Sequence, residues 1–321
     1  MKSKDQILDF FNTLSEASRV FIQAHNFPDH DAIAAAFGLQ KLMERFNVKA
    51  GICYDGSLER ESLKMMIKDL GIQVIHASES GMTGDDYIVI VDSCKDNKNV
   101  TALEGKVAAV IDHHVIKADI GAPFVDIRSA YGSTSTIIYE YYLKTHQTLS
   151  KNVATAMMIG LIKDTAGLTR GVSYHDIIAH SDLWHHANME YVHRMMKNDI
   201  QKEDLSFFQT AISLFRMEKN FGYIFFEDGC AQNLLGIIGD FFMSVHDLDF
   251  IAVIARNNGK INLSIRSEET VYNAAEVIET VLEGIGFGGG HEDMAGGIIE
   301  DYPNLSSEDI CNKFKKVLGI I

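Results

Sequence analysis

Several apolar runs of this sequence end on acidic or histidine side chains, which are residue types that bind divalent cations in proteins. The runs at 20–24, 87–91 and 107–111 are typical of buried parallel strands, and residues 156–162 form a longer apolar run. The polar residues that follow these runs, with a glycine triplet and its histidine near the carboxyl end, are His25, Asp29, Asp31, Asp92, Asp112, His113, His114, Asp164, Gly288, Gly289, Gly290 and His291. Because ligands of open α/β sheets bind beyond the carboxyl ends of the strands, we expect these side chains to converge on one edge.

The loop at 25–31 has the clearest chemistry, since it holds His25, Asp29 and Asp31 between an expected strand and an expected helix. Carboxylate oxygen and imidazole nitrogen without thiolate suit a moderately hard cation such as Mn²⁺, with Mg²⁺ or Co²⁺ as alternatives. Asp92 and Asp164 would add oxygen ligands. Alternatively, the two aspartates of the loop only cap the next helix, and the histidine is a hydrogen-bonded residue at a strand end. The acids and histidines at the other strand and helix ends favour the metal site.

The composition is that of an ordinary globular protein. The chain has 321 residues, of which 46% are hydrophobic and 23% charged, and this length suits two domains. With 44 acidic and 29 basic side chains, the formal charge of −15 disfavours binding of long nucleic acid through many phosphate contacts. The first residues lack the apolar core of a signal peptide, and no stretch approaches the roughly 18 apolar residues of a membrane span. We therefore expect a cytoplasmic protein, not bound to a membrane, that acts on short substrates.

Strand and helix signals alternate along the chain and predict an α/β fold, with a parallel sheet in an amino-terminal domain and a smaller mixed sheet in a second domain. The predicted domains are residues 1–196 and 205–321, joined by a linker at 197–204. In the first domain we expect strands at 20–24, 48–53, 74–77, 87–91 and 107–111, and helices at 4–18, 32–46, 58–70, 133–143, 153–163 and within 173–200. In the second we expect helices at 205–215, 233–245 and 273–283, and strands at 221–226, 250–256 and 260–265, with a hairpin turn at 257–259.

Taken together, the motifs resemble those of the DHH phosphoesterase family. The resemblance rests on the His-x-x-x-Asp-x-Asp loop at 25–31, the isolated Asp92, the Asp-His-His triplet at 112–114 and Asp164, in this order. Near the carboxyl end, Ser-Ile-Arg-Ser at 264–267 and Gly-Gly-Gly-His at 288–291 are similar to the DHH-associated domain of the first DHH subfamily. The resemblance covers nearly the whole chain and implies a phosphoesterase with its active site in the cleft between two domains.

The resemblance also implies a site for two metal ions. The ligands of one ion would be His25, Asp29 and Asp92. The ligands of the other would be Asp31, Asp92, His113 and Asp164. Asp92 would bridge the ions, Asp112 would orient the metal-bound histidines, and His114 would donate a hydrogen bond to the scissile phosphate. Two Mn²⁺ ions would acidify a bridging water that attacks the phosphate, so the Ser and Thr cluster at 133–136 is interpreted as a helix cap rather than a source of nucleophiles.

The glycines at 288–290 would offer successive backbone N–H groups to an anion. By the same resemblance, His291 and Arg266 would bind a non-scissile phosphate or nucleotide, since a guanidinium suits bidentate phosphate contacts. Glu292 and Asp293 depart from the small or apolar residues expected after this histidine, and they leave the choice of substrate open.

Other polar and aromatic residues receive no role at the site. The histidines of the expected helix at 173–200 do not have the spacing of a ligand set on one face; they are His175, His180, His185 and His186. Trp184, Met195 and Met196 are interpreted as packing residues. Arg170 is close to Asp164 in sequence but is left out of the site.

The leading hypothesis is a nanoRNase-like enzyme that hydrolyses short RNA or DNA oligonucleotides, with 3′-phosphoadenosine-5′-phosphate as a further substrate. The runner-up is a phosphodiesterase of linear or cyclic dinucleotides. A RecJ-type exonuclease would be longer, and a family II pyrophosphatase would carry lysine and arginine in place of the Gly-Gly-Gly-His motif. A non-catalytic nucleotide-binding module would lack at least one ligand, and none is missing. The sequence leaves the oligomeric state open, a homodimer included.

Overall fold

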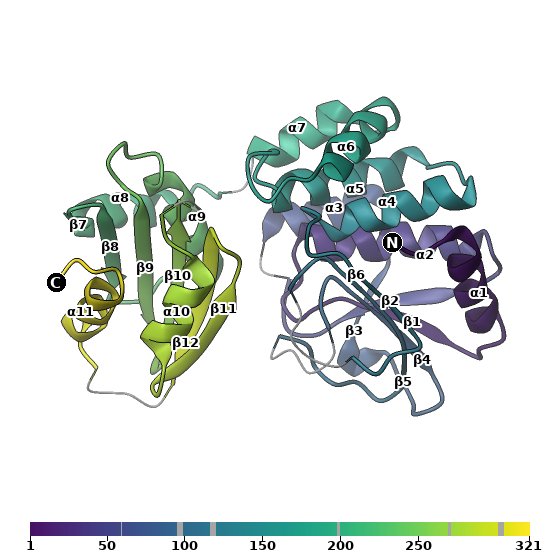
Figure 1. Ribbon diagram of the computed structural model, residues 1–321, viewed down its shortest axis with the longest axis horizontal. Coiled ribbons are helices and arrows are strands. Elements are labelled where there is room, and N and C mark those ends of the chain that lie inside the picture. The colour runs from purple at the N-terminus through teal and green to yellow at the C-terminus, as the bar shows by residue number, and fades with distance from the viewer. Residues whose placement is uncertain (59, 95–98, 116–119, 198–199, 269–270, 301–304) are drawn as a thin grey trace. The chain divides into compact units, whose positions relative to one another are not determined.

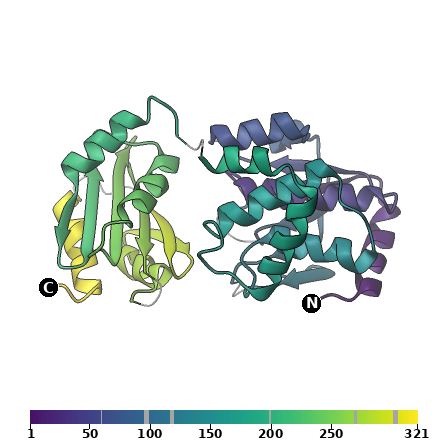
Figure 2. The same cartoon turned by 90° about the horizontal axis from the view of Figure 1, so that it is seen from above.

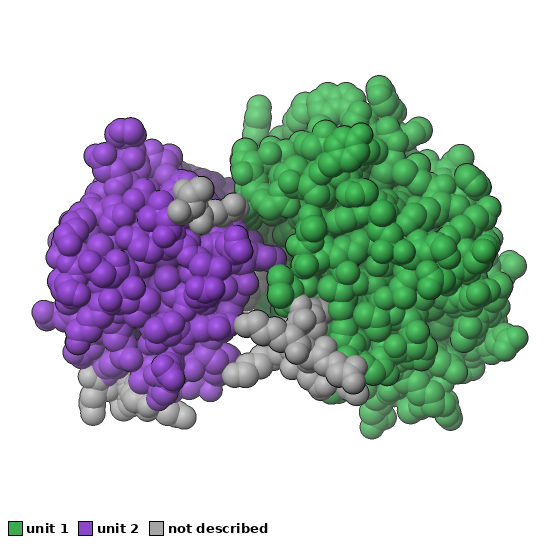
Figure 3. Space-filling view, viewed as in Figure 1, with its two compact units in different colours: residues 1–199 green, residues 200–321 purple. Residues whose placement is uncertain are grey.

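The computed structural model divides into two compact units, unit 1 at residues 1–199 and unit 2 at residues 200–321 (Figure 1 and Figure 3). It describes residues 1–58, 60–94, 99–115, 120–197, 200–268, 271–300 and 305–321. The predicted linker at 197–204 includes residues 198 and 199, and the predicted helix at 58–70 includes residue 59; these positions lie outside the described residues. Among the described helices, none has both the length and the apolar character needed to cross a lipid bilayer.

Unit 1 is built on a six-stranded parallel sheet. Its strands are β1 (Val20–Gln23), β2 (Ala50–Tyr54), β3 (Val74–His76), β4 (Tyr87–Val91), β5 (Lys106–Asp112) and β6 (Phe124–Ile127). Their order is β3-β2-β1-β4-β5-β6, and every neighbouring pair is parallel. The chain reverses its direction of progress across the sheet between β1 and β4, and such a switch point opens a crevice at the carboxyl ends of the two strands. The predicted parallel-sheet domain is therefore confirmed.

Helices cover one face of this sheet (Figure 1). The helices of unit 1 are α1 (Lys4–Ser15), α2 (His30–Glu44), α3 (Glu61–Leu70), α4 (Thr134–Thr145), α5 (Lys151–Asp164), α6 (Tyr174–His186) and α7 (Met189–Lys197). Helix α2 is buried on nearly all sides because its alanine-rich first half packs against the sheet and against α4 and α5. On the other face of β4 and β5, a small separate core includes Ile88, Ile90 and Val110, and loop residues cover it.

Unit 2 is a six-stranded mixed sheet with helices on both faces (Figure 1 and Figure 2). Its strands are β7 (Arg216–Glu218), β8 (Phe221–Phe226), β9 (Phe250–Asn257), β10 (Lys260–Ser267), β11 (Gly286–Gly290) and β12 (Met294–Ile299), in the order β11-β12-β10-β9-β8-β7. Helices α8 (Leu205–Leu214) and α9 (Gln232–Phe242) pack on one face, and α10 (Ala274–Leu282) and α11 (Ser307–Val317) on the other. The hairpin turn predicted at 257–259 is a two-residue loop, in which Asn258 and Gly259 have φ values of 49° and 80°, as such a turn requires. The predicted mixed-sheet domain is confirmed.

The sequence patterns miss β6, β7, β11, β12 and α11. Strands β6, β7 and β11 lie at sheet edges, and β11 and β12 are rich in glycine, which has little preference for strands. These glycines permit close packing, because a Cβ atom at Gly297 would lie 2.3 Å from Leu282 Cδ1 of α10. Helix α11 has a recognisable start, since Ser306 and Asp309 form a capping box.

Helices α2 and α5 approach each other closely at Gly160. A Cβ atom at this position would lie 2.7 Å from Asp31 Oδ1 and 2.7 Å from Ser135 Oγ. Gly38 of α2 faces α5 as well, but a Cβ atom there would lie 2.8 Å from the sulfur of Met157, which is the flexible part of that side chain. The two glycines therefore offer a matched comparison of a rigid and a soft contact.

We predict that Gly160→Ala lowers the free energy of unfolding of unit 1 by about 1–3 kcal/mol because the methyl group must displace buried atoms. The expected sign is opposite to that of helix propensity, which favours alanine over glycine by about 1 kcal/mol. Gly38→Ala should cost less, since Met157 can move. Chemical denaturation followed by the fluorescence of Trp184, the only tryptophan, reports on unit 1. A Gly160→Ala protein as stable as the wild type would contradict this account of the helix contact.

Candidate metal centre

His25, Asp29 and Asp92 come together at the carboxyl ends of β1 and β4, where the order of the sheet switches. His25 Nδ1 lies 2.9 Å from the carbonyl oxygen of Asn26, a contact that assigns the ring proton to Nδ1. Its Nε2 then faces Asp29 Oδ1 at 3.9 Å and Asp92 Oδ2 at 3.8 Å. Asp29 also begins α2, since its Oδ1 accepts the N–H of Ala32 at 3.0 Å. Capping the helix and facing this histidine are thus compatible roles for one carboxylate.

Asp92 stands in a backbone conformation that is rare for residues other than glycine. Its φ is 59°, in the left-handed region, and its N–H donates to the carbonyl of Ile111 at 2.9 Å. Its Oδ1 accepts a hydrogen bond from Thr134 Oγ1 at 2.8 Å and lies 3.5 Å from His113 Nε2, while Oδ2 faces His25. The turn after β4 therefore places one carboxylate between two groups of donor atoms.

His113 and Asp164 belong to the second of these groups. The Nδ1 atom of His113 lies 3.0 Å from the carbonyl oxygen of Tyr131, which assigns the ring proton to Nδ1 and leaves a lone pair on Nε2. That lone pair faces Asp164 Oδ2 at 3.0 Å. Two such acceptor atoms are stable at this distance only with a proton or a cation between them. The charges of Asp164 and Asp92 overcome the opposing effect of burial and raise the pKa of His113 well above its usual value.

Asp31 is buried at the start of α2, and the amino terminus of α4 points at its carboxylate. Oδ2 accepts the N–H of Thr134 at 2.7 Å, and Oδ1 accepts the N–H of Ser135 at 3.1 Å. A helix amino terminus stabilises a negative charge in this position. Even so, burial and the nearby charge of Asp164 raise the pKa of Asp31 to about 7. The N–H groups of α4 therefore offset only part of the negative charge of Asp31.

The residues present fit divalent cations. The first group of donors is His25, Asp29 and Asp92, and the second is Asp31, Asp92, His113 and Asp164; within each group the donor atoms lie within 4.8 Å of one another. Burial, and then the charges of Asp31 and Asp29, raise the pKa of Asp92 well above its usual value, so the site favours added positive charge. Oxygen and imidazole nitrogen without thiolate in either group suit Mn²⁺, Mg²⁺ or Co²⁺.

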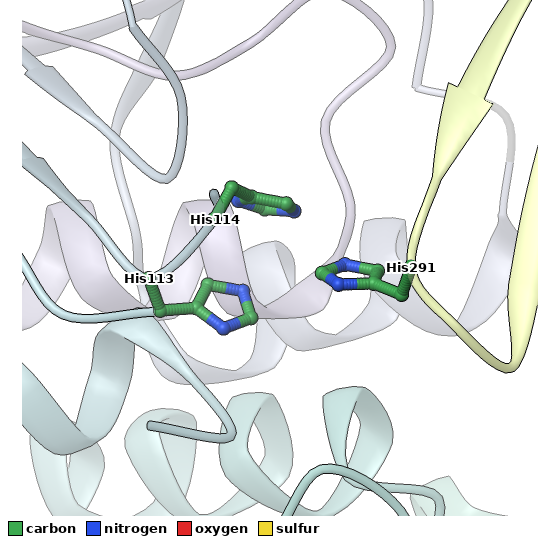
Figure 4. A group of neighbouring side chains, drawn as sticks. All are labelled: His113, His114 and His291. Atoms are coloured by element: carbon green, nitrogen blue, oxygen red, sulfur yellow. The ribbon is translucent and has the colours of Figure 1, made fainter. Parts of the chain in front are cut away.

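Asp112, the last residue of β5, holds His114. Its Oδ1 accepts the backbone N–H of His114 at 3.1 Å and the ring Nδ1–H at 2.7 Å. Burial raises the pKa of Asp112, but these contacts outweigh it, and the net effect is a lowered pKa. The sequence predicts that Asp112 orients both histidines, whereas in the structure the carbonyl of Tyr131 holds His113. Figure 4 shows the imidazole rings of His113 and His114, whose centroids lie 4.3 Å apart.

In unit 2, Arg266 lies on β10 and already has a carboxylate partner. Its Nε donates to Asp240 Oδ1 at 2.5 Å, and its Nη1 donates to Ser264 Oγ at 3.1 Å. The guanidinium lies against a glycine of α9, because a Cβ atom at Gly236 would be 2.8 Å from Nη2. No feature of the sequence predicts this ion pair, which fixes the orientation of the arginine.

The glycine triplet belongs to the edge strand β11 rather than to an irregular loop. The N–H of His291 donates to the carbonyl of Met294 at 2.7 Å as the strand pairs with β12. Successive N–H groups of an antiparallel strand alternate between the partner strand and the open side. Those of Gly288 and Gly290 therefore face the open edge, and that of Gly289 faces β12. The expectation of successive N–H groups that all point at one anion is corrected accordingly.

The segment at 131–135 is the part of the site that sequence reasoning missed. Its polar run predicts only a helix cap, and Ser133 does cap α4, since Ser133 Oγ accepts the N–H of Thr136 at 3.2 Å. The same run also brings the hydroxyl of Thr134 to Asp92 and two backbone N–H groups to Asp31. The backbone carbonyl of Tyr131, which orients His113, could not be predicted from the sequence, because every residue type has a backbone carbonyl.

The residues that the sequence left out of the site have other partners. Arg170 Nη2 donates to the backbone carbonyl of Asp164 at 3.2 Å. His175 Nδ1 lies 2.8 Å from Glu140 Oε1, and its ring stacks on that of Tyr131. Among the described residues, the donor groups include none of the histidines of α6. Met195 is buried in the core of unit 1, Met196 packs against it, and Trp184 contacts the rings of His180 and His193.

Family models match two segments of the chain. The model for the DHH family, N-terminal domain, matches residues 19–161, and the model for the DHHA1 domain matches residues 218–319. The chain therefore belongs to the DHH family and carries a DHHA1 domain in its second unit.

Relatives of known sequence extend this result. The chain is 26% identical over 313 residues to an uncharacterised protein of Methanocaldococcus jannaschii, MJ1633, covering 94% of this chain and 64% of that protein. It is 22% identical to the cyclic-di-AMP phosphodiesterase PdeA of Listeria monocytogenes, covering 92% of this chain and 47% of the relative. A probable manganese-dependent inorganic pyrophosphatase of Streptococcus thermophilus is 25% identical over 46% of this chain and 48% of its own length. The chain thus spans between about half and two thirds of the length of these relatives.

A solved structure shares the fold. An exopolyphosphatase-related protein from Bacteroides fragilis superimposes with a TM-score of 0.80 and 18% identity, covering 99% of this chain and 95% of that one. At this level of identity the likeness concerns the fold alone.

Replacing Thr134 with valine removes the hydroxyl that donates to Asp92 Oδ1 and preserves the shape of the side chain. We predict that the affinity for Mn²⁺ falls about 10- to 100-fold, as is usual when a group that orients a ligand is lost. Calorimetric titration of the metal-free protein measures this change. Thr134→Ser keeps the hydroxyl and should bind Mn²⁺ like the wild type. If Thr134→Val also retains full affinity, the hydroxyl does not orient Asp92.

Proposed function

We propose that unit 1 binds two divalent cations, Mn²⁺ by preference, and that the chain is a metal-dependent phosphoesterase of short RNA or DNA oligonucleotides. A further proposed substrate is 3′-phosphoadenosine-5′-phosphate. The observation that carries the proposal is the position of Asp92, whose two carboxylate oxygens face separate groups of donors. A single cation would require only one such group. Membership of the DHH family and the manganese-dependent relatives support the same conclusion.

In this proposal the first cation is held by His25, Asp29 and Asp92, and the second by Asp31, Asp92, His113 and Asp164. Divalent cations at such a site make water a stronger acid and offset the negative charge of a phosphate group. The side chain of His114 is 37% exposed and is anchored by Asp112, so its Nε2 can reach a bound phosphate. In its protonated form His114 would donate a hydrogen bond from Nε2 to a phosphate oxygen. A serine or cysteine nucleophile is not required.

Short nucleotide substrates are supported by the charge of the chain and by unit 2. A formal charge of −15 disfavours binding of a long phosphate backbone, which requires many contacts with positively charged groups. A short nucleotide requires only a few local contacts, which can form despite this charge. We propose that Arg266 and His291, with the open-edge N–H groups of β11, bind a phosphate or nucleotide that is not cleaved. This division of roles makes unit 1 the site of hydrolysis and unit 2 the source of preference for nucleotides.

A linear or cyclic dinucleotide is the second candidate substrate. Alignment with PdeA, a cyclic-di-AMP phosphodiesterase, extends over 92% of this chain and favours it. Inorganic pyrophosphate has less support, because the alignment with the pyrophosphatase covers only 46% of this chain.

A panel of substrates tests the proposal. We expect Mn²⁺-dependent turnover with the highest kcat/KM on short oligonucleotides, followed by 3′-phosphoadenosine-5′-phosphate, and little on longer RNA or pyrophosphate. Asp92→Ala should abolish activity on every substrate and bind neither cation, because it removes a ligand from both groups. His180→Ala, the control, should keep both cations and full activity. A preference for linear or cyclic dinucleotides would favour the second candidate, and a preference for pyrophosphate would contradict both.

A second test separates binding by unit 2 from hydrolysis in unit 1. Arg266→Ala and His291→Ala should lower kcat/KM for a dinucleotide about 10- to 150-fold, since a hydrogen bond to a charged group contributes about 1.5–3 kcal/mol. Both cations should remain bound. Turnover of bis-p-nitrophenyl phosphate, which lacks a second phosphate, should fall much less. Equal losses on both substrates, with the cations retained, would place these residues in the chemical step and contradict the proposed division.

A further inference from the structure

We propose that Asp176, at the start of α6, is a positioning residue of the metal centre. It acts through the segment at 131–135, which contacts Asp31, Asp92 and His113. The inference rests on the proposed metal centre and adds a residue that lies outside both donor groups.

Asp176 has no exposed surface, and both of its carboxylate oxygens accept hydrogen bonds. Oδ2 accepts the N–H of Gly132 at 2.9 Å, the N–H of Ser173 at 2.8 Å and the hydroxyl of Ser173 at 2.5 Å. Oδ1 accepts the hydroxyl of Thr136 at 2.6 Å. A buried carboxylate with this many donors is fixed in one orientation.

These contacts exceed what the helix needs. The capping box of α6 is complete with the contacts between Ser173 and Asp176. Gly132 and Thr136 lie 44 and 40 residues away in the sequence and take no part in α6. Asp176 therefore joins the start of α6 to the segment that precedes and begins α4.

That segment delivers four groups to the proposed ligands, one of them the N–H of Ser135, which donates to Asp31 Oδ1 at 3.1 Å. The carbonyl of Tyr131 accepts from His113 Nδ1 at 3.0 Å and directs Nε2 toward the site. The Thr134 hydroxyl donates to Asp92 at 2.8 Å, and the Thr134 N–H donates to Asp31 at 2.7 Å. Gly132, the residue whose N–H Asp176 holds, lies between Tyr131 and the helix, so its displacement would move both sides of the segment.

The segment at 131–135 is closely packed at Gly132, so it has little room to move. A Cβ atom at Gly132 would lie 2.6 Å from Thr165 Cγ2 and 2.9 Å from the carbonyl oxygen of Gly171. Thr165 directly follows Asp164, so the segment also packs beside the remaining ligand of the second group. Asp176 Oδ2 would lie 3.2 Å from the same Cβ atom, so Asp176 belongs to this enclosure and supplies its polar contacts.

The test compares Asp176→Ala with the substitution of another buried carboxylate, Asp86, which lies at the amino end of a strand of the unit 1 sheet. Asp86 is 2% exposed, accepts from Thr83 N at 2.7 Å and pairs with Arg19, and it directly precedes β4. Asp86→Ala thus removes a comparable hydrogen-bonded carboxylate far from the carboxyl ends of the strands. For each variant, Mn²⁺ affinity is measured by calorimetric titration of the metal-free protein, and folding of unit 1 by Trp184 fluorescence during denaturation.

We expect Asp176→Ala to bind Mn²⁺ about 10- to 100-fold more weakly than the wild type. Asp86→Ala should lose stability but keep its Mn²⁺ affinity. Asp176→Asn retains a carbonyl oxygen for the Gly132 N–H and should lie closer to the wild type. If Asp176→Ala folds and binds Mn²⁺ normally, or if Asp86→Ala weakens Mn²⁺ binding equally, the positioning role is wrong.

Two further results keep the inference separate from its premises. Should Asp176→Ala fail to fold, Thr136→Val removes one contact to the carboxylate and is expected to weaken Mn²⁺ binding by about three- to tenfold; unchanged affinity would overturn the proposal. A wild-type protein that binds no Mn²⁺ would refute the metal centre itself. Loss of Mn²⁺ affinity in Asp176→Ala, in a protein that turns over none of the nucleotides, would support the positioning role and reject the hydrolytic function.

Discussion

The repulsion among three carboxylates at one edge of the unit 1 sheet is the constraint on which the structure depends. Asp31, Asp92 and Asp164 have donor atoms within 4.8 Å of one another, in surroundings where water screens charge poorly. The chain offsets part of this charge with the amino terminus of α4, the hydroxyl of Thr134 and the ring of His113. The raised pKa values of Asp31 and Asp92 show that the compensation is incomplete. A divalent cation would offset the remaining negative charge. The cluster of carboxylates that destabilises the fold is therefore the same cluster that would bind the cations needed for phosphate chemistry.

The architecture of unit 1 places this charge where strands end and helices begin. The switch in strand order between β1 and β4 opens the edge, and the left-handed conformation of Asp92 turns its carboxylate into that opening. Helix α5 approaches α2 closely enough at Gly160 that a methyl group would meet Asp31. Position and orientation of the acids thus follow from backbone geometry as much as from side-chain contacts.

Much of this arrangement was predictable from the sequence. Strands β1, β4 and β5 are apolar runs followed directly by polar residues, so both the parallel sheet and the edge that would carry the acids could be read from the pattern. The hairpin turn after β9 was equally clear, because Asn258 and Gly259 accept positive φ. Glycine-rich β11 and β12 gave no strand signal, since their formation depends on pairing and on packing against α10 rather than on local preference.

The supports of the candidate site were harder to predict than its acids. A carboxylate or histidine can be recognised as a possible ligand from its residue type alone. The carbonyl of Tyr131 and the N–H groups of Thr134 and Ser135 are backbone groups, which almost every residue has, so the sequence does not distinguish them. Asp176 forms an ordinary capping box at the start of α6, and only tertiary contacts connect it to Gly132. Similarly, the partner that Asp240 provides for Arg266 comes from a different element of unit 2 and has no counterpart in the local sequence.

The sharing of Asp92 between two donor groups also has a consequence for chain connectivity. Ions bound there would join the ends of β1, β4 and β5 to α2 and α5, segments that lie between residues 20 and 164 of unit 1. This would be a reversible cross-link: the ions would bind the folded chain, in which the ligands are assembled, and not the unfolded chain, so their binding free energy would add to the stability of the fold. The free energy of unfolding of unit 1 would then increase with the concentration of free cation. The ions would stabilise the packing of the helices on the sheet as well as take part in the chemistry.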